Sequence, residues 1–201
     1  MKRILALLVV LAVFLGSTGA VFAQRVDVGI VLPTKDEPRW LQDVARFEDV
    51  IAETPYSVEV LFSQGSSAAE KTNVETLIAR GAKVIIICAH DAAAAAAAVE
   101  MAKFEGVTVI SYDRLITDTA AIDYYVTFDS ISVGEAMGQY LVDNVEGKDN
   151  PLYLYAGALT DNNSFLFFQG AWNVLQPKIA DGTFRIINSQ QARNYAHIKD
   201  L

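Results

Sequence analysis

The sequence has little of the chemistry on which metal sites and many enzymes depend. It contains one cysteine and two histidines in 201 residues. A single cysteine excludes a disulfide framework within the chain, and His90 and His197 show no metal-binding spacing. Cys88 ends the apolar run 84–88, where a thiol packs as a small hydrophobic group. We therefore expect neither a metal ion nor another cofactor.

Motifs for nucleophilic catalysis and for nucleotide binding are also missing. The sequence has no Gly-x-Ser-x-Gly elbow, the motif that presents the nucleophile of α/β hydrolases. Pro33-Thr-Lys35 follows the first expected strand, where a dinucleotide-binding fold has a Gly-rich loop. The formal net charge is −8, whereas nucleic-acid binding relies on basic contacts with phosphates. We therefore predict no catalytic residues and no nucleic-acid partner.

The amino terminus has the anatomy of a secretory signal peptide. A basic start at residues 1–3 precedes an apolar stretch at residues 4–15, and Val21-Phe-Ala23 is a small-residue cleavage pattern. The apolar stretch is shorter than the roughly 20 residues that a membrane-spanning helix needs, so a retained anchor is the less favoured alternative. We predict a signal peptide at residues 1–23, cleaved near Ala23, and export of the remainder to the periplasm.

The rest of the chain alternates between strand patterns and helix patterns. Four runs rich in β-branched residues are typical of buried strands; they lie at residues 26–32, 57–62, 83–88 and 107–111. Amphipathic or alanine-rich stretches between them predict helices at residues 39–51, 68–80 and 92–104. Successive strand–helix units favour right-handed crossovers and one parallel sheet.

A second, shorter series of elements follows. It comprises an extended segment at residues 122–128, helices at 132–145 and 163–175, strands at 152–156 and 184–188, and the start of a helix within 189–201. We therefore expect an α/β fold with two lobes. Residues 24–128 form the amino-terminal lobe, and residues 129–201 form part of a second lobe.

Polar and aromatic residues follow the carboxyl ends of the expected strands, where ligands collect in open parallel sheets. They are Lys35, Arg39 and Trp40; His90 and Asp91; Asp113 and Arg114; Asp161, Asn163, Phe165, Phe167 and Phe168. Carboxylate, amide and guanidinium groups bind hydroxyls by hydrogen bonds, and an aromatic face covers the apolar face of a sugar ring. The set suits a neutral ligand rich in hydroxyl groups.

Each candidate residue also has a structural interpretation. Asp113 and Arg114 can form a surface or hinge ion pair, and Trp40 can be a core residue of an amphipathic helix. Asn163 can cap the helix that it opens. At least one of the phenylalanines must face the core, and His90 can be a solvated loop residue. The residue types alone leave these alternatives open.

Six short motifs, in order along residues 25–180, resemble the periplasmic sugar-binding proteins of ABC importers, in particular the branch that binds xylose or multiple monosaccharides. They are Pro33-Thr-Lys35, Pro38-Arg-Trp40, Ser111-Tyr-Asp-Arg-Leu-Ile116, Tyr124-Tyr-Val-Thr-Phe-Asp129, Val133-Gly134 and Asp161-Asn-Asn163. The resemblance implies a type I periplasmic binding protein fold, with two similar α/β domains joined by a hinge of three segments. A monosaccharide lies between the domains and closes the hinge.

The resemblance also implies roles for individual residues. Arg39 and Trp40 are first-domain contacts, with Trp40 as the stacking platform, while Asp113 and Arg114 grip ring hydroxyls. Asn163 and Phe167 are second-domain contacts, and residues 125–129 are the first hinge crossing. The implied ligand is a xylose-, glucose- or galactose-like sugar. The implied partner is an inner-membrane ABC permease, with a chemoreceptor or sensor kinase as a further possibility.

The sequence departs from this family in length, because family members continue well beyond its last residue. We therefore expect a carboxyl-terminally truncated chain whose incomplete second lobe exposes apolar strand edges and binds sugar weakly or not at all. Two other functions stay open: a periplasmic sugar-sensing module and an exported α/β glycosidase. A glycosidase needs two carboxylates across the sugar; Asp113 and Asp161 are candidates, although Arg114 would keep Asp113 ionised.

Overall fold

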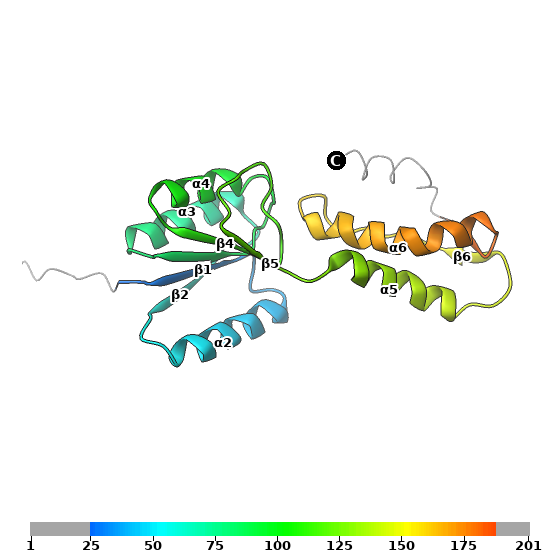
Figure 1. Cartoon of the computed structure of the whole chain (residues 1–201), viewed down its shortest axis with the longest axis horizontal. Helices are drawn as coiled ribbons and strands as arrows, with labels where there is room; N and C mark the ends of the chain where they lie inside the picture. Colours follow the sequence, from blue (N-terminus) through cyan, green and yellow to red (C-terminus); the bar gives the residue numbers. More distant parts are fainter. Residues whose placement is uncertain (1–24, 188–201) are drawn as a thin grey trace, which may run out of the picture.

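The computed structural model describes residues 25–187, which form two α/β units, each with its own sheet (Figure 1). Residues 25–126 are the first unit and residues 130–187 are the second unit. The predicted signal peptide and the helix predicted within residues 189–201 lie outside the described residues. No helix of the described part is long and apolar enough to cross a membrane.

The first unit is a five-stranded parallel sheet in the order β2-β1-β3-β4-β5. Its strands are β1 (Val28–Leu32), β2 (Val58–Phe62), β3 (Val84–Ile87), β4 (Thr108–Tyr112) and β5 (Tyr124–Val126). Its helices are α2 (Pro38–Ala52), α3 (Ser67–Ala79) and α4 (Ala96–Phe104). Figure 1 shows α3 and α4 on one face of the sheet and α2 on the other. The predicted α/β fold with a parallel sheet is therefore confirmed.

Alternation along the strands gives this sheet a core on each face. Val31 packs toward the cluster beneath α3 and α4, while Ile30 and Leu32 pack with Trp40 beneath α2. Cys88 is fully buried in the second cluster, and burial raises the pKa of its thiol to about 12. The thiol is thus a packing group at neutral pH.

One helix of the first unit begins later than the sequence predicts. The prediction placed its start at Ala92, but α4 starts at Ala96, and residues 92–95 form turns. Asp91 does accept hydrogen bonds from the N–H groups of Ala93 and Ala94, at 3.0 and 2.9 Å. The cap therefore closes a turn that precedes the helix rather than the helix itself.

The second unit consists of α5 (Ser130–Asp143), β6 (Asn150–Leu152), α6 (Asn162–Ala180) and β7 (Phe184–Ile186), with β6 and β7 paired in parallel. Helices α5 and α6 lie side by side (Figure 1). Glycines allow this approach: a Cβ at Gly134 would lie 2.2 Å from the Phe167 carbonyl oxygen, and one at Gly170 would lie 2.0 Å from that of Ile131.

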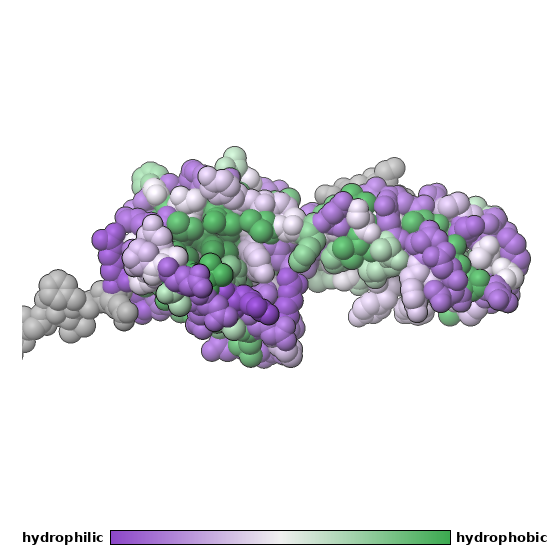
Figure 2. Space-filling view, turned by 60° about the horizontal axis from the view of Figure 1, so that its bottom comes forward, coloured by the Kyte–Doolittle hydropathy of each residue, from purple (hydrophilic) through white to green (hydrophobic). Residues whose placement is uncertain are grey.

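The second unit also has an open apolar cavity of about 770 Å³ between its two helices and residues 152–157. Figure 2 shows hydrophobic groups reaching the surface of this unit. The strand predicted at residues 152–156 is wrong beyond Leu152, because β7 ends at Ile186 and no other described strand pairs there. The side chain of Tyr155 is 91% exposed. Apolar groups near the short sheet are thus open to solvent.

Candidate ligand-binding site at the junction of the two units

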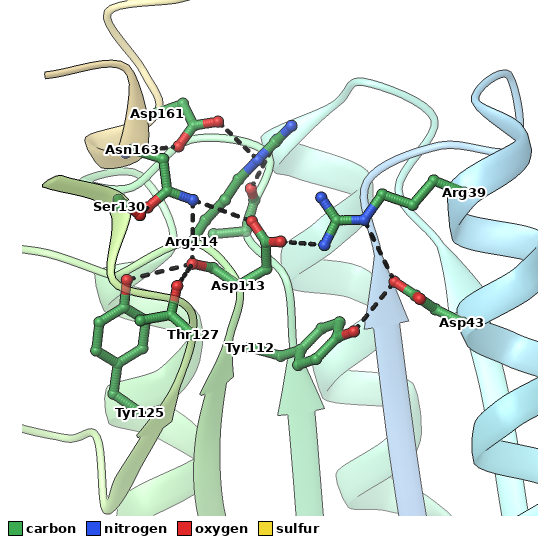
Figure 3. A network of polar contacts seen from close by, with 11 residues as sticks. Arg39, Asp43, Tyr112, Asp113, Arg114, Tyr125, Thr127, Ser130, Asp161 and Asn163 are labelled. Atoms are coloured by element: carbon green, nitrogen blue, oxygen red, sulfur yellow. Dashed lines mark hydrogen bonds and ion pairs between the residues drawn. The ribbon is translucent and has the colours of Figure 1, made fainter. Parts of the chain in front are cut away.

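The site is organised around Asp113, the residue that follows β4. Its φ is +63°, a left-handed conformation that Asp tolerates better than most residues. Its N–H donates to the carbonyl oxygen of Val126, at 2.8 Å, which ties the turn to β5. Figure 3 shows that the side chains of Asp113 and Arg114 point to different partners from this turn.

The side-chain carboxylate and the backbone carbonyl oxygen of Asp113 each accept several hydrogen bonds, although the residue is only 7% exposed. Its carboxylate accepts from the Arg39 guanidinium and, at 3.0 Å, from the Asn163 amide. Its carbonyl oxygen accepts from the hydroxyls of Thr127 and Tyr125, at 2.8 and 3.2 Å, and from the Asn163 amide at 3.1 Å. A buried carboxylate needs such partners to offset its lost hydration.

Asn163 brings the second unit to this carboxylate. It lies in the first turn of α6, is 6% exposed, and accepts a hydrogen bond from the Ser130 hydroxyl at 3.3 Å. Asp161, not Asn163, caps the helix, because its carboxylate accepts from the Asn163 N–H at 2.9 Å. The Asn163 side chain is therefore available to bridge the two units (Figure 3).

Arg114 makes a second link between the units. Its Nε lies 3.0 Å from the Asp161 carboxylate, and its Nη1 donates to the carbonyl oxygen of Ala89 at 3.2 Å. The structural alternative, an ion pair between Asp113 and Arg114, is not formed, and each residue pairs with a different partner. Asp113 pairs with Arg39 within the first unit, and Arg114 pairs with Asp161 of the segment that leads into α6.

Arg39 is held by acidic groups on both sides. It bonds to Asp113, and its Nε lies 3.6 Å from the carboxylate of Asp43, which also accepts from the Tyr112 hydroxyl at 3.1 Å. Burial of the guanidinium lowers the pKa of Arg39, but the bond to Asp113 and the charges of both carboxylates outweigh it, so the pKa is raised. The side chain stays 48% exposed and can still meet a ligand.

Trp40 lies beneath the two arginines rather than at an open surface. It is 3% exposed, and the guanidinium carbons of Arg39 and Arg114 lie 4.5 and 5.6 Å from its ring centroid. Such cation–π contacts orient the arginines. No hydrogen-bond partner for its indole nitrogen lies within residues 25–187. In this arrangement Trp40 supports the arginines from the core, and its ring offers no open face for stacking.

The remaining candidates lie apart from the Asp113 network. Phe167 lines the apolar cavity of the second unit, and the Lys35 ammonium lies 4.8 Å from the ring centroid of Phe62. His90 lines a separate polar cavity of about 320 Å³, together with Arg114 and Asp161. This cavity adjoins the Arg114–Asp161 pair, so His90 borders the site without joining the network.

Three residues whose side chains bond to Asp113 or Asn163 escaped the sequence-based selection. They are Tyr125, Thr127 and Ser130, whose hydroxyls bond to Asp113 or Asn163. Tyr125 and Thr127 lie in the motif that the resemblance marked as a hinge crossing, and this motif was the sequence signal that could have identified them. A ligand hydroxyl can replace any of these groups, because it both donates and accepts. No group of three metal-ligating side chains occurs among residues 25–187.

Comparisons with known proteins identify several similar chains. A family model described as a periplasmic binding protein domain matches residues 28–201. The "Multiple sugar-binding periplasmic protein SbpA" of Azospirillum brasilense is 33% identical over 87% of this chain and 50% of its own length. The D-xylose-binding periplasmic protein of Escherichia coli is 32% identical over 85% of this chain and 51% of its own length.

A solved structure is more similar still. It is a carbohydrate transporter solute binding protein from Chloroflexus aurantiacus in complex with D-glucose, with 67% identity and a TM-score of 0.80. The match covers 85% of this chain and 50% of that chain. The chain thus spans about half the length of the curated relatives that it matches. By the extent of the family match, the chain belongs to the periplasmic binding protein domain family.

Proposed function

We propose that the chain is part of an exported solute-binding protein that holds a monosaccharide between its two units for ABC-type import. The observation that carries this proposal is the Asp113 carboxylate, reached by Arg39 from the first unit and by Asn163 from the second. A ligand that bonds both to this carboxylate and to the Asn163 amide contacts both units at once and favours their closure. The similar proteins named for binding multiple sugars and D-xylose support the same ligand class.

The charges of the site favour a neutral ligand. Asp113 and Asp161 each pair with an arginine, so an uncharged sugar leaves the charge balance of the site intact. Vicinal hydroxyls can accept from Arg39 and Arg114 and donate to Asp113, in place of the Asn163 amide. A xylose-, glucose- or galactose-like sugar meets these requirements, and D-glucose is the ligand of the similar solved structure.

The proposal assigns a role to each part of the chain. Residues 1–23 are a signal peptide cleaved near Ala23, residues 24–128 are the amino-terminal lobe, and residues 129–201 belong to the second lobe. Residues 125–129 are a hinge crossing. The periplasmic relatives support export, and the separate sheets support two lobes.

A binding role is favoured over glycoside hydrolysis. A hydrolase needs one carboxyl group that is protonated and can donate to the leaving group. The two candidate carboxylates, Asp113 and Asp161, are each bonded to a guanidinium group, so neither is free to face a leaving group. The chain is therefore proposed to carry no catalytic residue.

A sensing role is a second candidate. The "Multiple sugar-binding periplasmic receptor ChvE" of Rhizobium radiobacter is 32% identical over 84% of this chain and 49% of its own length. That relative is named a receptor, which favours a chemoreceptor or sensor kinase as an additional partner. The same closed form would serve both partners, because closure changes the surface that each unit presents.

The proposal can be tested by isothermal titration of the purified chain with D-glucose, D-xylose, D-galactose and L-arabinose. Because the second unit contributes only Ser130, Asp161 and Asn163 to the described site, we expect selective but weak binding, on the order of millimolar. Asp113→Asn should weaken it at least tenfold by removing the charged acceptor.

Asp118→Asn is a matched control. Asp118 is exposed and has a φ of +60°, so the variant makes the same charge change on the same backbone conformation outside the network. The proposal is wrong if no sugar gives a saturable response up to about 100 mM. Equal losses in the two variants would also contradict it.

A further inference from the structure

Glu70 is a buried carboxylate beneath the edge of the site, and no cationic side chain among residues 25–187 bonds to it. It lies on α3 and is 1% exposed. Its Oε2 accepts from the N–H of His90 at 2.8 Å and from the hydroxyl of Ser63 at 3.5 Å. Its Oε1 has no hydrogen-bond partner within residues 25–187. A buried polar atom without a partner is costly and calls for an explanation.

The segment that Glu70 holds, residues 89–92, carries two contacts of the candidate site. The carbonyl oxygen of Ala89 accepts from Arg114 Nη1, at 3.2 Å. The N–H of Ala92 donates to the carbonyl oxygen of Thr160, at 3.0 Å, directly before Asp161. Glu70 is therefore connected through one short segment both to a candidate ligand contact and to the second unit.

We propose that Glu70 is a positioning residue of the ligand site, and that its protonation loosens residues 89–92 and lowers the affinity for the ligand. This inference rests on the proposed function. The ionised carboxylate accepts a charge-assisted hydrogen bond from the His90 N–H, which is about twice as strong as a neutral one. Protonation weakens this bond, so Ala89 and Arg114 are held less firmly.

The surroundings place this protonation in the physiological range. Burial raises the pKa of Glu70 to about 7, although the hydrogen bonds from His90 and Ser63 oppose the shift. Two charged groups also act on the carboxyl: Asp91 on the same segment raises its pKa, and Arg114 from the end of β4 lowers it. The imidazole of His90 is the neighbouring titratable group whose effect must be separated from that of Glu70.

The test is a titration of the full chain with D-glucose at pH values from about 5.5 to 8.5. We expect wild-type affinity to rise about threefold to tenfold across this range, which is the worth of one strengthened hydrogen bond. Glu70→Gln should bind at every pH with the affinity that the wild type shows at the acidic end, because its side chain stays neutral.

Two control variants make the result specific. Glu75→Gln removes the same charge from an exposed position on the same helix, and His90→Asn removes the imidazole but keeps the backbone N–H. Both should keep the pH dependence of the wild type. A Glu70→Gln variant with the wild-type pH profile, or a flat profile in His90→Asn, overturns the inference.

A measurement without sugar separates this inference from the proposed function. The chemical shift of the backbone N–H at position 90, followed by NMR in the His90→Asn variant so that no imidazole contributes, should titrate with an apparent pKa near 7 and should not titrate once Glu70→Gln is added. Failure of every sugar to bind overturns the proposed function and the coupling to affinity. An N–H shift that titrates equally in both proteins overturns the role of Glu70 in positioning the segment.

Discussion

The buried carboxyl of Glu70 makes the stability of the first unit dependent on pH in an unusual direction. Burial raises its pKa from 4.5 to about 7, so between these values the folded state binds more protons than the unfolded state. The contribution of Glu70 to the free energy of unfolding is therefore fully present below pH 4.5. It declines as the pH rises toward 7 and then levels off. A shift of this size corresponds to a loss of roughly 3 kcal/mol, at 1.36 kcal/mol per pKa unit.

The perturbation that tests this reasoning is Glu70→Gln, which keeps the shape of the side chain and cannot ionise. Urea unfolding, followed by far-UV circular dichroism, gives the free energy of unfolding at each pH. At about pH 5 the variant and the wild type should differ little, whereas near pH 8 the variant should be more stable by up to about 3 kcal/mol. Glu75→Gln should follow the wild type throughout.

The Asp181 carboxyl, whose pKa is also strongly shifted, titrates outside this pH window. The pKa of Asp181 is lowered to about 2 by hydrogen bonds from Thr183 and from Lys148. Its stabilising effect is lost only as the pH falls below about 4, well outside the window. Because both proteins contain the same histidines, any histidine contribution cancels when the unfolding free energies of wild type and Glu70→Gln are subtracted. Parallel stability curves for the two proteins from pH 5 to 8 would refute the assignment.

Three further predictions follow from the described contacts. Asp113→Ala should destabilise the chain by about 1–2 kcal/mol more than Asp113→Asn, because alanine tolerates the φ of +63° less well; urea unfolding of both variants measures the difference, and equal values contradict it. Gly134→Ala should lower the thermal midpoint by several degrees, because its Cβ would lie 2.2 Å from the Phe167 carbonyl oxygen. Calorimetry should reveal this loss, and an unchanged midpoint would show that α5 and α6 can separate freely. Finally, the open cavity beside Met137 should bind the dye ANS, and Met137→Lys should reduce the fluorescence; an absence of dye binding by the wild type would show that the cavity is covered in solution.

The architecture of the first unit was predictable because its signals are local. Each strand is a short apolar run, and each helix ends near a glycine or a polar cap. The alternation of strand and helix patterns along the chain was therefore enough to indicate a parallel sheet. The start of α4 was not predictable, because the alanine run gives no change in pattern between Ala92 and Ala96. The end of β6 depended on pairing with β7, which is a long-range property that residues 152–156 do not encode.

The sequence predicted where the residues of the candidate site lie better than it predicted which of them pair with one another. A polar pair at the end of β4 follows from the strand pattern, and Asn163 was expected nearby. The positive φ of Asp113 was not foreseen, and with it Arg114 pairs with Asp161 instead of its neighbour. The burial of Trp40 was only one of two interpretations, because an amphipathic helix pattern does not say which apolar side chain lies beneath a charged one.

The two ion pairs of the site, Arg39–Asp113 and Arg114–Asp161, contribute differently to ligand binding. Arg39 and Asp113 belong to one unit, so their pairing does not depend on closure and keeps the acceptor oriented. The Asn163–Asp113 and Arg114–Asp161 contacts cross between the units, so they form only when the units approach. A ligand hydroxyl that displaces the Asn163 amide exchanges one hydrogen bond for another, and the net gain is small. Affinity must then come mainly from the additional hydroxyls that bridge the units and from the apolar area that closure buries.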